Sequence, residues 1–192
     1  MKEWGFLFAV LITCMAMVAV AQQPASKAQL AASIPTGSAA EQSSIAFDAN
    51  KVSVKYLAPS MGGRKVFGGI VPFKQVWPIG GGSAATFHTD GDLVFKGVVV
   101  PKGDYSLYLL PEPDKMQLII SKQTGPKTQA HNPKMDLGRV PMVLRKATAP
   151  VETCKLTLTK TASRAGRIEL TWENTVAMVP FALDWAPGDP EW

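Results

Sequence analysis

Residues 154–160 read CKLTLTK, and this stretch decides the fold class because its side chains alternate between apolar and polar. A period of two is typical of a β-strand that buries one face, whereas a helix repeats every 3.6 residues. The segment RIELTWE at residues 167–173 repeats the alternation. The inward positions of the two stretches are Cys154, Leu156, Leu158, Ile168, Leu170 and Trp172.

Other parts of the chain have the same character. DYSLYLL at residues 104–110 and MQLIIS at residues 116–121 read as strands joined by the turn-forming PEPDK. Turn-forming residues recur about every ten positions, which is typical of sandwiches and barrels. We therefore predict an all-β fold, a mostly antiparallel β-sandwich or jelly-roll-like domain over residues 45–185, followed by a tail at residues 186–192. The irregular residues 121–136 predict a functional or mobile loop.

The first residues have the pattern of a signal peptide. An apolar run at residues 5–20 is shorter than the roughly 20 residues of a membrane span, and the small residues Ala19 and Ala21 precede QQP. We expect cleavage after Ala21 and a periplasmic or secreted product. An uncleaved membrane anchor or a lipidated Cys14 are the alternatives. Residues 22–44 are rich in Ala, Ser and Gln with few large apolar side chains, and they predict a flexible tether.

Charge and cysteine content restrict the function further. The net charge is +5, but the basic residues are scattered, so we expect no nucleic-acid partner. Once residues 1–21 leave, Cys154 is the single cysteine, and no internal disulfide can form. Its inward phase predicts a buried, unreactive thiol rather than a nucleophile, and no G-x-S-x-G motif is present.

The stretch VWPIGGGSAATFHTD at residues 76–90 suggests several kinds of site. A phosphate-binding loop needs a helix directly after its glycines, and the sequence after Gly82 reads as a strand instead. The three glycines therefore predict a tight bend between strands. Trp77, beside Pro78, is a binding candidate that could stack on a sugar or peptide at a pocket mouth. The alternative is that Trp77 belongs to the core.

His88 is the second candidate in this stretch. Because Phe87 is expected to face the core, His88 should face solvent or the outer side of a sheet. Asp90-Gly91 is typical of a two-residue hairpin turn, and Asp104 also falls in a predicted turn. A zinc site would need His131 as well, and His131 lies in the irregular segment. We expect neither a metal site nor a cofactor.

Five segments together resemble a family of exported bacterial proteins catalogued as domain of unknown function 2911. They are VSVKYLAPSMGGRKVFGGIVPFKQVW, ATFHTDGDLVF, PKGDYSLYLLP, MQLIIS and LTWENTVAMVPF. The resemblance covers residues 52–181. It implies a signal peptide and one β-rich domain, and it implies no activity.

The resemblance also bears on the glycine-rich stretch. The family's typical version reads W-R-x-G-A-N-E-A-T-T, and this chain matches it at Trp77, Gly80, Ala84 and Thr86. The Arg, Asn and Glu of the family pattern are absent here, with Pro78 in place of Arg, Gly82 in place of Asn and Ser83 in place of Glu. Arg64, in GGRKVFGG, matches. The resemblance therefore implies that a polar family site is altered in this chain.

We expect an exported, non-catalytic protein that binds a glycan, a peptide or a partner in the cell envelope. The binding candidates are Arg64, Trp77, His88, Asp90 and Asp104. The alternative is a hydrolase-like enzyme with its site near Arg64, Trp77 and His88. Convergence of Arg64 with His88 and an aspartate at the floor of a concave pocket would favour the enzyme.

Overall fold

The structure, a computed structural model, describes residues 38–183. The expected signal peptide with its cleavage after Ala21, Cys14, most of the tether and the tail at residues 186–192 lie outside the described residues. The described chain forms a 10-stranded antiparallel sheet and a short 3-10 helix, η2 (Pro133–Met135). Within this part, no helix has the length and apolar character that crossing a membrane requires.

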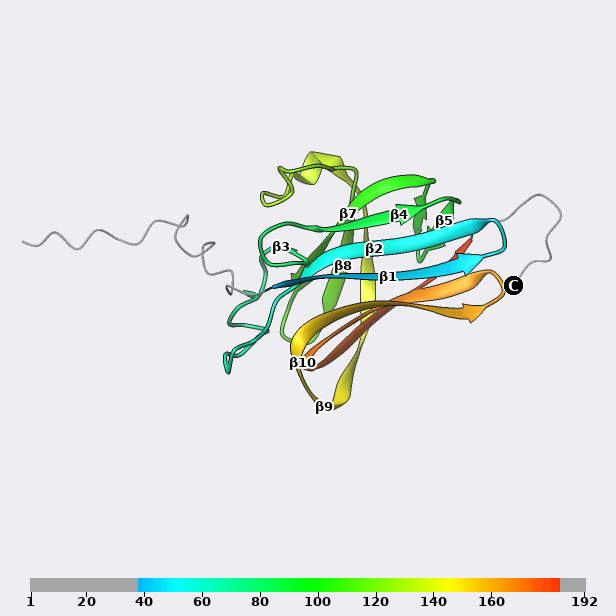
Figure 1. Cartoon of the computed structure of the whole chain (residues 1–192). Coiled ribbons are helices and arrows are strands. Elements are labelled where there is room, and N and C mark those ends of the chain that lie inside the picture. The colour runs from blue at the N-terminus through cyan, green and yellow to red at the C-terminus, as the bar shows by residue number, and fades with distance from the viewer. Residues whose placement is uncertain (1–37, 184–192) are drawn as a thin grey trace, which may run out of the picture. The chain divides into compact units, whose positions relative to one another are not determined.

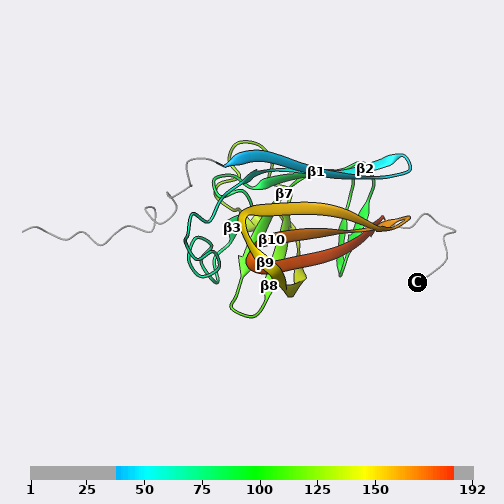
Figure 2. The ribbon, with the colours of Figure 1, turned by 60° about the horizontal axis from the view of Figure 1, so that its bottom comes forward.

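The strands follow one another along nearly the whole described chain. They are β1 (Ala39–Phe47), β2 (Asn50–Ala58), β3 (Trp77–Pro78), β4 (Ala85–Thr89), β5 (Leu93–Phe95), β6 (Val98–Val100), β7 (Gly103–Pro111), β8 (Met116–Ser121), β9 (Asp136–Ala162) and β10 (Ala165–Leu183). Their order in the sheet is β1-β2-β4-β7-β8-β9-β10-β5-β6, with β3 paired to β7. The sheet folds into two layers, with β1, β2, β4 and β7 in one and β10 in the other (Figures 1 and 2). The predicted all-β fold is confirmed.

Two long strands join the layers. β9 pairs with β8 through its first residues and with β10 along most of its length. The pairing of β9 with β10 shifts register on both sides of Glu173, whose φ is 53°. Such a bulge increases twist and bends both strands. The Glu173-Asn174 pair, which reads as a turn signal, therefore marks a bend inside β10 rather than its end.

Side chains close the seam where β9 faces β1 and β2. The backbone N–H of Leu158 donates to the Ser43 hydroxyl at 2.9 Å, and that of Leu156 donates to the Tyr56 hydroxyl at 2.9 Å. The N–H of Cys154 donates to the carbonyl of Pro59 at 2.9 Å. An unpaired strand edge leaves polar groups exposed to unwanted pairing. Here hydroxyl groups take the place of a neighbouring strand.

The core lies between the layers and contains two aromatic groups. Trp77 and Trp172 pack with ring centroids 5.7 Å apart. Farther along the sheets, four phenylalanines are linked ring to ring: Phe47, Phe87, Phe95 and Phe181. All the inward positions predicted from the two alternating stretches are buried. Cys154 is fully buried, as its inward phase predicted, and burial raises the pKa of its thiol to about 12.

Two expectations need correction. Residues 39–44 belong to β1 and not to a flexible tether, because nine backbone pairs with β2 stabilise a strand that needs few apolar side chains. Asp90-Gly91 does not close a hairpin. β4 pairs with β2 and β7, whereas β5 pairs with β10 and β6, so the chain crosses between layers at this point.

Candidate functional site

The five predicted site residues do not form one site. His88 pairs with Ser53 of β2, while Arg64 lies in the segment that leaves β2 beyond its last residue. The two therefore lie toward opposite ends of this strand. Trp77 is 8% exposed and packs on Trp172, so the structure places it in the core rather than at a pocket mouth.

His88 and the two aspartates do come together. Asp104 faces His88 across β4 and β7, and its Oδ1 lies 2.8 Å from the Nδ1 of His88. Asp90, two residues along the chain, places its Oδ1 2.9 Å from Nε2. The other oxygen of Asp90 accepts a hydrogen bond from the backbone N–H of Lys51 at 3.1 Å. The His88 side chain is 41% exposed, as the alternation of β4 predicted.

This geometry favours the charged imidazole. An ionised carboxylate only accepts hydrogen bonds, so both ring nitrogens of His88 must carry protons to donate. Hydrogen bonds to Asp90 and Asp104 raise the pKa of His88. The hydrogen bond from His88, followed by that from the Lys51 backbone, lowers the pKa of Asp90. The three side chains form a surface ion-pair cluster, which we call the His88 cluster.

The stabilisation that the His88 cluster provides depends on pH in a defined direction. Because the pKa of His88 is raised, its contribution is complete below about pH 6.5 and is lost as the pH rises through the folded-state pKa. The contribution of Asp90 is present above about pH 3.9 and is lost as the pH falls through its lowered pKa. The cluster is therefore most stabilising between about pH 4 and pH 6.5.

We expect the Asp90→Asn and Asp104→Asn variants each to lower the pKa of His88, with the larger effect from Asp90. Each variant removes a carboxylate that stabilises the imidazolium. An NMR pH titration of the His88 ring protons measures the change, with Asp92→Asn as a nearby exposed control. A midpoint that stays the same in both cluster variants would contradict the assigned geometry.

The His88 cluster does not have the arrangement of a metal site. Its carboxylates contact opposite nitrogens of one ring, so the three side chains do not converge on a common point. Among residues 38–183, no group of three or more His, Cys, Asp or Glu residues could hold a metal ion. His131 is engaged elsewhere, with Nε2 2.6 Å from Oδ1 of Asp136.

The segment that carries Arg64 is held by acidic side chains. Arg64 donates from Nε to the carbonyl of Met61 at 3.1 Å. Glu152 accepts from the N–H of Gly62 at 2.7 Å, and Glu173 accepts from the N–H of Val66 at 3.3 Å. These carboxylates fix the backbone of the GGRKVFGG segment. Arg64 and the His88 cluster therefore do not make up the combined site that would favour the enzyme alternative.

The three glycines make the bend predicted for them. Gly80 and Gly81 have φ values of 128° and 78°, and the N–H of Gly81 donates to the carbonyl of Pro78 at 3.0 Å. A β-strand, β4, follows the bend. Of the positions that depart from the family pattern, Ser83 lines a polar groove on the outer side of β2.

Sequence reasoning missed how the irregular segment is organised. The Nε2 of Gln123 donates to the carbonyls of Lys127 and Ala130 at 2.7 and 2.8 Å, and its Oε1 accepts from the N–H of Asn132. The hydroxyl of the buried Tyr108 donates to the carbonyl of Thr128 at 3.0 Å. The segment covers the outer face of β7. Alternation could have shown this, because Tyr108 is a large side chain on that outer face.

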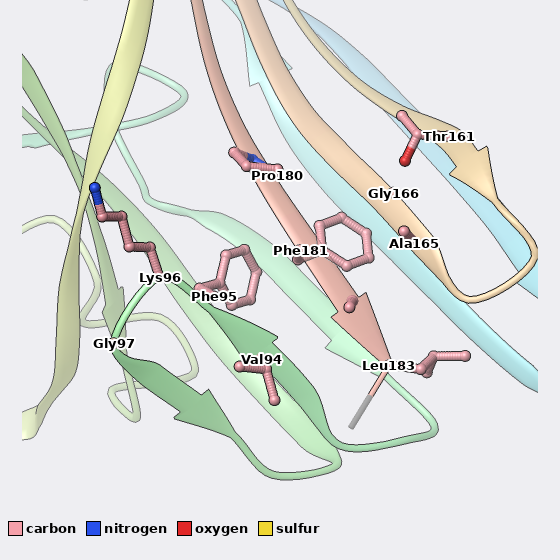
Figure 3. Close-up of a pocket in the computed structure, with 11 residues that line it drawn as sticks. Val94, Phe95, Lys96, Gly97, Thr161, Ala165, Gly166, Pro180, Phe181 and Leu183 are labelled. Carbon is pink, nitrogen blue, oxygen red and sulfur yellow. The ribbon is translucent and has the colours of Figure 1, made fainter. Parts of the chain in front are cut away.

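An apolar groove of about 470 Å³ lies where both ends of β10 meet β5. Figure 3 shows the rings of Phe95 and Phe181 next to each other, with Ala165, Gly166 and Thr161 on the facing hairpin. The full lining is Val94, Phe95, Lys96, Gly97, Thr161, Ala165, Gly166, Pro180, Phe181, Ala182 and Leu183. We call it the β5–β10 groove. None of the five predicted binding residues lines it.

Close packing gives this groove a fixed floor. A Cβ atom at Gly166 would lie 2.8 Å from the ring of Phe181 and 2.9 Å from Ile45, so only glycine lets the ring sit there. Phe181 also packs on Phe95, with centroids 5.4 Å apart. The N–H of Leu183 donates to the carbonyl of Arg164 at 2.8 Å and ties the end of β10 to the turn that precedes this strand.

Comparison with known proteins gives one match. A family model described as "Protein of unknown function (DUF2911)" matches residues 38–181, which is nearly the whole described chain. No curated protein and no solved structure matches the chain significantly. The match confirms the resemblance inferred from the five sequence segments.

Proposed function

This chain belongs to the family of proteins of unknown function DUF2911, and from this premise we propose that it is an exported, non-catalytic binding protein. In this proposal the β5–β10 groove takes the hydrocarbon chain of a small carboxylate amphiphile. The single observation that carries the proposal is the groove itself, about 470 Å³ in volume and lined mainly by apolar groups. Small-molecule sites typically have about 300–1,000 Å³ and mainly apolar walls.

The surface around the groove supports an apolar ligand. Val94, at the groove, is paired across the strands with Val99 of β6. Both are exposed, at 36% and 54%. Contiguous exposed apolar surface is typical of interaction sites, whereas single exposed apolar side chains are common. The apolar surface therefore continues beyond the groove and provides room for a chain that extends from it.

Charge supports an anionic end on the ligand. Lys96 contributes the charged side chain of the lining, and its side chain lies on the side of the groove opposite Thr161 (Figure 3). The chain as a whole carries a net charge of +5. A positive field favours the approach of anions. A ligand with a carboxylate at the rim near Lys96 and a hydrocarbon chain along Phe181 matches both the positive charge and the apolar lining of the groove.

The proposed setting is the periplasm or the cell exterior. The apolar run at residues 5–20, with the small residue Ala19 near its end and Ala21 directly after it, supports export. An intact mass of the exported protein that begins at Gln22 supports cleavage of a signal peptide, and an intact mass that retains residues 1–21 contradicts it.

A calorimetric titration with hexanoate, octanoate and decanoate, kept below micelle-forming concentrations, tests the proposed ligand. Each buried methylene contributes about 0.8 kcal/mol, so the affinity should rise about fourfold per methylene until the groove is filled. The Lys96→Gln variant should bind decanoate up to about fivefold more weakly and decanol equally well, because it removes one exposed ion pair.

A groove-filling variant provides the control for location. Ala165→Trp places a large side chain in the groove and should abolish binding of decanoate. Val143→Trp adds the same side chain at an exposed apolar position outside the groove and should leave binding intact. Circular dichroism checks that both variants fold. Equal binding to both variants, or affinities that do not depend on chain length, would overturn the proposal.

A further inference from the structure

A second groove, of about 390 Å³, lies on the first three strands of the sheet order. It is lined by Ala40, Glu41, Gln42, Lys55, Tyr56, Leu57, Ser83, Ala84 and Thr86. We call it the β2 groove. The register places Gln42 opposite Lys55 and Lys55 opposite Thr86, so three polar side chains form one row across β1, β2 and β4.

Four polar side chains of the β2 groove are not used inside the described chain. Within residues 38–183, no hydrogen bond or ion pair engages the side chains of Gln42, Lys55, Ser83 or Thr86, whereas the Tyr56 hydroxyl accepts from the N–H of Leu156. The neighbouring row behaves differently, because His88 and Asp104 are bound to each other there. A concave surface with an amide, two hydroxyls and an ammonium offers donors and acceptors to a ligand.

The β2 groove combines a charge with an apolar contact. Lys55 contributes a positive charge to the polar row, whereas Glu41 is paired with Tyr56 and lies on the opposite face of β1. Leu57 is 37% exposed and provides an apolar contact beside the polar row. Sugars combine hydroxyl groups around the ring edge with apolar C–H faces. The arrangement therefore matches a hydroxylated ligand with one apolar face.

The end of the β2 groove is fixed before any ligand binds. The glycine bend brings Ser83 close to Gly80, where a Cβ atom would lie 2.6 Å from the Ser83 carbonyl oxygen. The N–H of Ala84 donates to the hydroxyl of the buried Thr128 at 3.3 Å. A site that is already ordered loses less conformational entropy when it binds. The glycine-rich stretch thus positions one end of the polar row.

From these observations we propose that the β2 groove is a binding site for a short oligosaccharide. Gln42, Lys55 and Thr86 would bind its hydroxyl groups, and Leu57 would contact one ring face. The inference is independent of the apolar ligand proposed for the β5–β10 groove, because the two grooves share no lining residue.

The test is an NMR titration of the full mature protein with trisaccharides of glucose, galactose, mannose and N-acetylglucosamine. Each sugar is added to about 10 mM, because a few hydrogen bonds are expected to give a dissociation constant in the millimolar range. At least one trisaccharide should give saturable amide shifts at Gln42, Lys55 and Thr86. The Gln42→Ala and Thr86→Ala variants should each weaken binding, by up to about tenfold, since each removes one hydrogen-bonding partner.

Thr157→Ala is the matched control, because it removes the same hydroxyl from an exposed threonine of β9 outside the groove. Its affinity should equal that of the unmodified protein. Three outcomes would overturn the proposal: no saturable shift with any of the four sugars, shifts confined to residues outside the β2 groove, or equal affinity in the Thr86→Ala and Thr157→Ala variants.

Discussion

Replacing Trp172 with alanine is expected to lower the free energy of unfolding by about 3–5 kcal/mol, the range for removing a large aromatic side chain from a core. Trp172 is completely buried and packs on Trp77 at 5.7 Å. Its Nε1 also donates to the carbonyl of Glu152 at 3.1 Å. The variant therefore leaves a cavity and removes one hydrogen bond, while the Glu152 carbonyl still accepts from the N–H of Met61 at 2.9 Å. Chemical denaturation, followed by circular dichroism, measures the loss.

Trp172→Phe provides the graded control. It keeps an aromatic ring against Trp77 but removes the donor to Glu152 and part of the volume, so the loss should be clearly smaller than that of the alanine variant. An exposed replacement such as Val143→Ala should change stability little. A loss below about 1 kcal/mol for Trp172→Ala would contradict the placement of Trp172 at the centre of the core.

Replacing Gly80 with alanine is expected to lower the free energy of unfolding by about 2–3 kcal/mol, the upper part of the range for a strained backbone position. Gly80 has a φ of 128°, which side chains rarely tolerate. A Cβ atom there would lie 2.6 Å from the carbonyl oxygen of Ser83, and this backbone atom cannot move without opening the bend. Equilibrium unfolding in urea measures the difference.

Gly81→Ala separates the steric collision from the backbone conformation. Gly81 lies in the same bend and has a φ of 78°, but a Cβ atom there would meet only ordinary contacts, the nearest 3.8 Å away. Its replacement should therefore cost less than that of Gly80. If the two variants are equally stable, the collision with Ser83 is not what requires glycine at position 80.

The strands that bury one face could be predicted from the sequence. The alternation around Leu156 and Leu170 is visible because each strand exposes its other face to water. β1 was missed because its stability comes from backbone pairing with β2, and only its last residues, Ile45 to Phe47, pack apolar side chains inward. The bend at Glu173 was misread as a strand end because a bulge and a turn use similar residues.

The sites were harder to predict than the strands. The outward position of His88 followed from alternation, but its contact with Asp104 depends on the register between β4 and β7. The β5–β10 groove joins residues near 95, 165 and 181, which are distant in sequence. Its one local signal was Val94, an apolar side chain at an outward position of β5. Arg64 and Trp77 stood out by composition, yet Arg64 hydrogen-bonds to Met61 in its own segment and Trp77 packs on Trp172 in the core.

The most direct test of the proposed function is an NMR measurement of intermolecular nuclear Overhauser effects between decanoate and the mature protein. Ligand binding in the β5–β10 groove predicts contacts from the terminal methyl group of decanoate to the ring of Phe181 and to the methyl groups of Val94 and Leu183. These contacts should disappear in Ala165→Trp and persist in Val143→Trp. Absence of these contacts under saturating decanoate, or contacts only to residues outside the groove, would contradict the proposed function.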